Sequence, residues 1–302
     1  MPVSSAKSLD PAVLDRLGSL TLVARTVVEG FMAGHHRSPQ KGSSVEFAQH
    51  RQYVPGDELR AVDWKIFARS DRLVVKEFVA ETNFSCHLLV DASESMAFRS
   101  LEWSKFDYAR WCAAALGHMV VHQRDAAGLV LFDEGVRDKV PPSNAMHQEA
   151  EIVAVLEKAE PRGATGVGEV LKWIAGRLRR RGIVAIFSDF FDDLDRLVEG
   201  MRRLTFRGHE PILFQILDPQ ELEFDYAELR RLDGLEGTGK IKVDPRAIRS
   251  AYLEEIRNHQ EELARAARTL SCDFVPLSTS VALDVALSTY LARRAARART
   301  RS

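Results

Sequence analysis

A cluster of oxygen-bearing side chains follows the apolar run HLLV at residues 87–90. Residues 91–95 read Asp-Ala-Ser-Glu-Ser, so Asp91, Ser93 and Ser95 come directly after what should be a buried strand. Carboxylate and hydroxyl oxygens suit a hard cation such as Mg²⁺, which prefers oxygen ligands in octahedral geometry. The cluster therefore predicts one loop of a cation site and favours a binding module over a hydrolase.

Two further segments could complete such a site. The apolar run 183–188 leads into Asp189, and Thr165 lies in the glycine-rich segment 161–171, before an expected helix. Ligands of an open parallel sheet gather at the carboxyl ends of its strands, so Asp91 and Asp189 are expected at the same edge. The glycines around Thr165 would let its backbone approach a neighbour closely.

The elements that must position these residues are short apolar strands alternating with helices from residue 85 onward. The expected strands are 87–90, 127–132, 136–140, 183–188, 211–217 and 274–276, and the expected helices are 105–122, 146–159, 167–181, 194–206 and 281–294. This alternation predicts an α/β fold with a doubly wound, mostly parallel sheet covered on both faces. The second and third strands are too close for a crossover, so an antiparallel edge hairpin is expected.

We expect two parts in the chain: an N-terminal part at 1–84, and an α/β domain at 85–302 with an insertion at about 218–272. The N-terminal part should begin with a helix from Asp10-Pro11 to about Met32, with Gly18 as its weak point. A block with mixed charged and aromatic residues follows at 43–84. It should be rich in β-structure and pack on the α/β domain.

Smaller elements are expected within the block and the insertion. In the block, Pro55-Gly56 predicts a turn, 63–69 a short helical turn and 74–84 a strand. In the insertion, a glycine-rich turn at 234–239 precedes a long charged helix that runs from Asp244-Pro245 to about Thr269.

Composition limits the function classes. The chain has 302 residues and a formal net charge of −1, which argues against a general affinity for nucleic acid. Its three cysteines form no CxxC pair, so neither zinc nor disulfides are indicated, and Cys86 and Cys272 are expected in the core. The early apolar stretch 20–33 is too short to span a bilayer, and residues 1–11 lack the apolar core expected of a signal peptide. We expect a cytoplasmic protein.

Asp91, Ser93, Ser95, Thr165 and Asp189 together resemble the metal-ion-dependent adhesion site of von Willebrand factor A domains in order, spacing and strand context. The resemblance implies a Rossmann-type fold of that kind. It also implies that the three hydroxyls ligate Mg²⁺ or Mn²⁺ directly, while the two aspartates act mainly through water. The ion would then keep an open position that an Asp or Glu side chain of a protein partner can fill.

Two positions depart from that pattern. Gly166 stands where an acidic residue often follows the threonine, and Phe190 stands where glycine often follows the aspartate. Both bear on affinity and loop shape but leave the ligands in place. Asp192 and Asp193 are expected to cap the next helix. The alternative for residues 91–95 is that they only turn a loop or cap the helix that begins near Ser104.

The segment from Ser43 to Glu81 is similar to the signature of the bacterial domain of unknown function 58 proteins. The similarity rests on Glu46, Phe47, Arg51, Tyr53, Gly56, Asp57, Arg60, Asp63, Trp64, Lys65, Ala68, Arg69, Lys76 and Glu81, and it extends over roughly residues 35–295. Proteins of this family are typically encoded beside MoxR-type AAA+ ATPases. The resemblance implies an adaptor or chaperone component that works with such an ATPase. For the signature block itself we favour an ion-paired hairpin over a direct partner surface.

Enzyme interpretations are weaker. Residues 234–241 fall short of a phosphate-binding loop, and a glycine turn between two strands accounts for them better. His118 and His122 lie one helical turn apart and could be half of a metal site, but no third ligand is apparent, so a polar helix face is the favoured interpretation. The main hypothesis is a noncatalytic, Mg²⁺-dependent interaction module. The alternatives are a metal-dependent phosphohydrolase that uses Asp91 and Asp189, and a structural module without metal.

Overall fold

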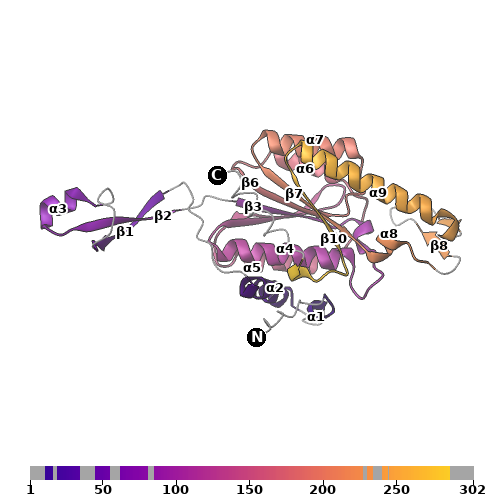
Figure 1. Ribbon diagram of the computed structural model, residues 1–302, viewed down its shortest axis with the longest axis horizontal. Coiled ribbons are helices and arrows are strands. Elements are labelled where there is room, and N and C mark those ends of the chain that lie inside the picture. The colour runs from indigo at the N-terminus through magenta and orange to yellow at the C-terminus, as the bar shows by residue number, and fades with distance from the viewer. Residues whose placement is uncertain are drawn as a thin grey trace, which may run out of the picture. The chain divides into compact units, whose positions relative to one another are not determined.

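The computed structural model describes residues 11–15, 19–34, 45–54, 62–80, 85–226, 230–233, 240–243 and 245–285 (Figure 1). The chain divides into two compact units, Arg37–Phe84 and the remainder. The boundary at residue 85 agrees with the expected start of the α/β domain. The N-terminal helices, however, belong to the larger unit.

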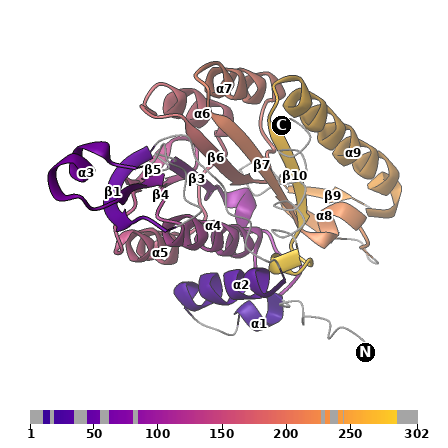
Figure 2. The same cartoon turned by 60° about the vertical axis from the view of Figure 1, so that its left-hand side comes forward.

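A six-stranded sheet forms the centre of the larger unit, with the order β10-β7-β6-β3-β4-β5 (Figure 2). Its strands are β3 (Ser85–Asp91), β4 (Ala126–Phe132), β5 (Val136–Ser143), β6 (Gly182–Ser188), β7 (Glu210–Leu217) and β10 (Asp273–Ser278). All neighbours pair in parallel except β4 and β5, which form the predicted antiparallel edge. The doubly wound, mostly parallel α/β fold is confirmed.

The order of the strands reverses beside β3. From β3 the chain moves outward to β4 and β5, and then returns to the other side of β3 to form β6, β7 and β10. A crevice opens at the carboxyl ends of the strands at such a switch point. Asp91 is the last residue of β3, and Asp189 directly follows β6. Both aspartates therefore lie at the place where this fold class binds ligands.

Helices cover both faces of the sheet (Figure 2). One layer holds α2 (Leu20–Gly34), α4 (Lys105–His122) and α5 (Gln148–Lys158), and the other holds α6 (Val167–Ala175), α7 (Leu194–Phe206) and α9 (Pro245–Thr269). Burial on both faces explains why every residue of β3 is buried. A core cluster joins β3 and β6 to α6, α7 and α9 through Leu89, Ile186, Leu171, Leu197 and Leu263.

Two expected helices differ in extent. The N-terminal helix is described in two parts, α1 (Pro11–Asp15) and α2, and Gly18, the predicted weak point, lies between them outside the described residues. The helix expected at 167–181 ends at Ala175, because Arg177 and Leu178 both donate to the carbonyl of Ile174 and tighten the last turn. The closing helix expected at 281–294 lies outside the described residues beyond residue 285.

The insertion contains α8 (Pro219–Glu223), which the sequence pattern did not indicate, and the antiparallel pair β8 (Arg230–Asp233) and β9 (Lys240–Val243). The pair confirms that residues 234–241 connect two strands, although 234–239 lie outside the described residues. The 25-residue helix α9 follows, as predicted.

The smaller unit contains β1 (Val45–Gln52), α3 (Trp64–Ser70) and β2 (Val74–Ala80), with β1 and β2 paired antiparallel. Asp63 caps α3 by accepting hydrogen bonds from the backbone N–H groups of Lys65 and Ile66, which confirms the predicted helical turn. The turn expected at Pro55-Gly56 and the end of the strand expected at 74–84 lie outside the described residues.

Among the described residues, none of the helices combines the length and the apolar character that a membrane span requires. The three cysteines are all buried and free, which confirms Cys86 and Cys272 as core residues.

Candidate metal centre

Asp91 is the last residue of β3 and is fully buried. Its Oδ1 accepts a hydrogen bond from the backbone N–H of Ser93 at 2.9 Å. Its Oδ2 accepts from the hydroxyls of Ser188 at 2.6 Å and Thr165 at 3.1 Å. One carboxylate therefore joins the ends of β3 and β6 to the loop before α6.

The loop after β3 presents its two serines together. The hydroxyl oxygens of Ser93 and Ser95 lie 3.1 Å apart, and Ser93 is fully buried. Backbone hydrogen bonds tie this loop to the Thr165 loop, from Glu94 to the Gly163 carbonyl and from Arg162 to the Ala92 carbonyl, both at 2.8 Å. Four of the five predicted ligands are thus directly linked by hydrogen bonds or by a hydroxyl contact.

Asp189, the fifth, is also fully buried but is held by other groups. Its Oδ2 accepts from the Lys105 ammonium at 2.8 Å, and its Oδ1 accepts from the backbone N–H of Phe191 at 3.2 Å. The same ammonium donates to Glu221 of α8 at 2.7 Å. Asp189 therefore lies near Asp91 but has an intramolecular cation as its partner.

The electrostatics of the site favour an additional positive charge. Burial, followed by the nearby Asp189 carboxylate, raises the pKa of Asp91 to about 7. Burial lowers the pKa of the Lys105 ammonium, but Asp189 and Glu221 outweigh it and raise the pKa overall, so Lys105 stays charged. The Lys105 ammonium thus pairs with Asp189 and Glu221, and no cation among the described residues pairs with Asp91. The residues present therefore fit a hard cation in both donor type and charge.

The two departures from the adhesion-site pattern have steric explanations. A Cβ atom at position 166 would lie 2.8 Å from the carbonyl oxygen of Glu134, so only glycine fits beside that backbone. Phe190 has a φ of 59°, in the left-handed region that favours glycine. Its ring is fully buried in the core cluster, and that burial offsets the backbone strain.

The next two aspartates were both expected to cap the following helix, and this is confirmed for Asp193 but not for Asp192, which bonds to the preceding helix α6. Asp193 is the N-cap of α7 and accepts from the backbone N–H of Arg196 at 2.9 Å. Asp192 accepts from the backbone N–H of Gly168 in the first turn of α6 at 2.9 Å. Together they fix the loop after β6 between two helix N-termini.

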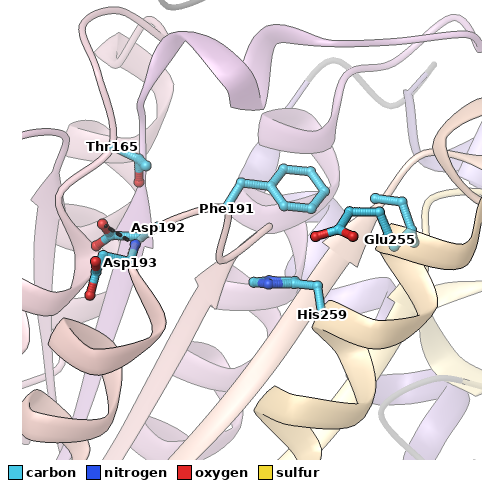
Figure 3. A pocket seen from close by; sticks show the side chains of 7 residues that line it. Thr165, Phe191, Asp192, Asp193, Glu255 and His259 are labelled. Atoms are coloured by element: carbon cyan, nitrogen blue, oxygen red, sulfur yellow. Dashed lines mark hydrogen bonds between the residues drawn. The ribbon is translucent and has the colours of Figure 1, made fainter. Parts of the chain in front are cut away.

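A groove of about 470 Å³ opens beside Thr165 (Figure 3). Thr165, Asp192 and Asp193 line one side, Glu255 and His259 of α9 line the other, and the ring of Phe191 stands between them. Ile256 adds apolar surface. A predicted metal ligand therefore borders a space that can admit a side chain from another molecule.

Sequence reasoning missed three residues of the site: Ser188, Lys105 and Glu221. Ser188 was placed in a strand, although a polar residue at the end of an apolar run is a signal. Lys105 occupies the first position of α4, where the helix dipole disfavours a cation, and that mismatch is a second signal. Glu221 lies 116 residues from Lys105, and no local pattern joins them.

The fold and the site define an α/β protein whose oxygen-bearing residues converge at the switch point of a mostly parallel sheet. The family model "Protein of unknown function DUF58" matches residues 49–262, and the chain belongs to this family.

Named relatives and solved structures give further similarities. The chain is 26% identical to the uncharacterized protein Rv1480 of Mycobacterium tuberculosis over 89% of this chain and 86% of that protein. It is 38% identical to the uncharacterized protein YeaD of Bacillus subtilis over 24% of this chain and 18% of that protein.

Two solved structures are similar at low identity. The conserved hypothetical protein BatB from Bacteroides thetaiotaomicron is 15% identical, with a TM-score of 0.46 over 70% of this chain and 98% of that chain. The SpRpn10 VWA domain is 14% identical, with a TM-score of 0.41 over 68% of this chain and 94% of that chain.

Proposed function

We propose that this protein is a noncatalytic, Mg²⁺-dependent protein-interaction module. The observation that supports it most is that Asp91, Ser93, Ser95 and Thr165 converge in a buried site. There the negative charges of Asp91 and Asp189 lie close enough to interact. In this proposal the hydroxyls of Ser93, Ser95 and Thr165 hold the ion, and Asp91 and Asp189 balance its charge. Mn²⁺ could take the same place.

The partner would offer an acidic side chain to the open position of the ion. The groove beside Thr165 gives that side chain a route, and Phe191 and Ile256 give its neighbours apolar contact. Asp193 and Glu255 at the groove would favour basic or hydroxyl groups next to the acidic residue. A partner segment with one acid among basic residues fits this surface best.

The similarity of the signature block to the domain of unknown function 58 proteins suggests the identity of the partner. We propose a MoxR-type AAA+ ATPase and an adaptor or chaperone role in the cytoplasm. Nucleic acid is not part of this proposal, since the formal net charge is only −1, and neither is a membrane span.

The alternatives differ in what they require of the aspartates. A phosphohydrolase with Asp91 as nucleophile needs a second acid two residues further on, where Ser93 stands. A structural module without metal has one observation in its favour, because Lys105 already supplies a cation to Asp189. Metal binding therefore needs a direct test.

Calorimetric titration with Mg²⁺ tests the metal site. We expect binding by the wild type and loss of at least tenfold in affinity in Asp91→Ala and Thr165→Val. Because Asp91 is buried and could affect folding, Thr165→Val is the decisive variant. Thr205→Val is its matched control, since that hydroxyl donates only to carbonyls within α7. Equal Mg²⁺ affinity in the wild type and Thr165→Val would refute the metal site and favour the structural module.

Phosphatase assays separate the binding module from the phosphohydrolase. We expect the wild type to hydrolyse p-nitrophenyl phosphate in Mg²⁺ no faster than Asp91→Ala does. Turnover that the wild type supports and Asp91→Ala lacks would overturn the noncatalytic proposal.

Affinity capture tests the partner. We expect a MoxR-type AAA+ ATPase with wild-type bait in Mg²⁺, and loss of the ATPase with Thr165→Val bait in the same buffer. The variant is needed because EDTA also removes the metal of the ATPase. Failure to recover an AAA+ ATPase with wild-type bait would reject the adaptor role and leave the metal site as a separate question.

A further inference from the structure

A second group of metal-ligand side chains lies away from the candidate metal centre, between α4 and α5. His118 and His122 come from the last turns of α4, and Glu149 comes from the first turn of α5. One ligand atom from each lies within 4.8 Å of the other two. The structure thus supplies the third ligand that the sequence pattern did not reveal.

The two histidines lie side by side on α4. Their rings lie 3.8 Å apart between centroids and are tilted by only 30°. The Nδ1 atom of His122 lies 3.0 Å from the His118 carbonyl oxygen, which can only accept a hydrogen bond. His122 Nδ1 therefore carries the proton, and Nε2 of the neutral ring keeps its lone pair for a metal.

The carboxylate of Glu149 contacts one of the two histidines. Its Oε1 lies 2.9 Å from Nδ1 of His118, and the side chains of His118 and Glu149 are only 10% and 16% exposed. His122 is exposed and leaves a path from solvent. The group therefore combines a partly buried imidazole–carboxylate pair with an open entrance.

We propose that His118, His122 and Glu149 form a site for a divalent transition metal ion such as Zn²⁺. Two imidazoles and one carboxylate are a ligand set for Zn²⁺, with water in the fourth position. Imidazole is a poor ligand for Mg²⁺, so this site and the oxygen site at Asp91 select different ions. Since the ligands come from two helices, the bound ion would fasten α5 to the end of α4.

The competing explanation is a polar pair, in which Glu149 only accepts a hydrogen bond from His118. It requires nothing of His122, which contributes an exposed ring. Substitution of His122 therefore separates the two explanations without disturbing the buried His118.

The test is titration of the full-length protein with Co²⁺, read by its visible absorption bands, followed by displacement with Zn²⁺. We expect one Co²⁺ per chain in the wild type, and at least tenfold weaker binding in His122→Asn and Glu149→Gln. His147→Asn is the matched control, because His147 is 70% exposed at the N-cap of α5 and pairs with Glu151. Thr165→Val should bind Co²⁺ like the wild type, which keeps this result independent of the Mg²⁺ site.

Thermal unfolding gives a second readout. Zn²⁺ should raise the Tm of the wild type, Thr165→Val and His147→Asn, but not that of His122→Asn. Wild-type binding no tighter than that of His122→Asn, or equal Zn²⁺ stabilisation of the two, would overturn the proposal in favour of the polar pair.

Discussion

Lys105 is not a predicted metal ligand, but it supplies the positive charge next to Asp189 at the candidate metal centre. It is 1% exposed, begins α4, and donates to the carboxylates of both Asp189 and Glu221. A buried ammonium is tolerated only when it is paired and fully hydrogen-bonded, and here both partners come from distant parts of the chain. The ion pair therefore links α4 to the end of β6 and to α8.

We predict that Lys105→Met lowers the free energy of unfolding by about 3–5 kcal/mol, because two buried carboxylates then lose the cation that pairs with both of them. Urea denaturation in EDTA measures the change. Lys172→Met is the control, since Lys172 pairs with Glu169 on an exposed helix face, and its effect should be below about 1 kcal/mol. Equal stability of Lys105→Met and the wild type would show that the buried pair contributes nothing.

His87 gives a prediction on pH. Burial, followed by the charge of the nearby His209, lowers the pKa of His87 to about 4. The unfolded chain protonates this histidine below about pH 6.5. Acidification between pH 6.5 and 4 therefore stabilises the unfolded state and reduces stability. We expect the contribution of His87 to the free energy of unfolding to fall by about 1–2 kcal/mol between pH 7 and pH 5. It is measured as the difference between the wild type and a His87 variant, because protonation of Asp91, whose pKa is raised to about 7, stabilises the folded state over the same range.

The comparison variant is His87→Gln, in which this part of the pH dependence should disappear. His147→Gln, at an exposed position, should retain it. If chemical denaturation at pH 7 and pH 5 gives the same difference in His87→Gln as in the wild type, His87 does not cause the loss of stability.

At the scale of elements, α6 and α7 pack at two glycines. A Cβ atom at Gly200 would lie 2.6 Å from the Cβ of Leu171, and one at Gly168 would lie 2.6 Å from the Cβ of Arg196. The loop that carries Thr165 leads directly into α6. This close packing therefore holds a predicted metal ligand in place.

We predict that Gly200→Ala destabilises the protein by about 1–3 kcal/mol, because overpacking outweighs the gain of about 1 kcal/mol that alanine usually brings to a helix. Gly176→Ala is the control, since the nearest atom to its Cβ would be the Trp173 carbonyl oxygen at 3.5 Å. Thermal and urea unfolding of both variants measure the difference. A Gly200→Ala variant more stable than the wild type would mean that the helices can separate at no cost.

The extent to which the sequence predicts the elements depends on how local their signals are. The bounds of α4 and α7 were predicted correctly, because each helix begins at a residue type that favours the N-cap position. Ser104 caps α4 together with Asp107, and Asp193 caps α7. Asp91 and Asp189 could be named as candidates because they follow apolar runs, and Thr165 because it lies in a glycine-rich segment before a helix. Lys105 and Glu149 were not assigned to sites, since their partners lie on other elements and no periodic pattern connects them.

At the scale of the whole molecule, the signature block behaves as a unit with its own hydrogen bonds and buried residues. Val62 and Val75 form an isolated bridge and are only 4% and 5% exposed. Tyr53 and Asp63 donate backbone hydrogen bonds to the carbonyls of Leu73 and Val74. The strands β1 and β2 and the helix α3 therefore hold one another.

We predict that Val75→Ala destabilises this unit alone by about 1–3 kcal/mol. Hydrogen exchange followed by mass spectrometry should show faster exchange in β1 and β2 and unchanged exchange in β3 and β6. Leu213→Ala in β7 should have the opposite pattern. Equal acceleration in both units after Val75→Ala would mean that they unfold together.

The hydrogen bonds of Asp91 reach 74 residues along the chain to Thr165 and 97 residues to Ser188. A chain still emerging from the ribosome holds the first loop long before β6 has been synthesised. The full set of oxygen ligands then exists only when β6 has inserted beside β3, on the side opposite β4. Cation binding would therefore mark the insertion of β6 beside β3, while β7 (Glu210–Leu217) and β10 (Asp273–Ser278) are still to be added. A partner that recognises the bound ion would select chains that have passed this step over those that have not.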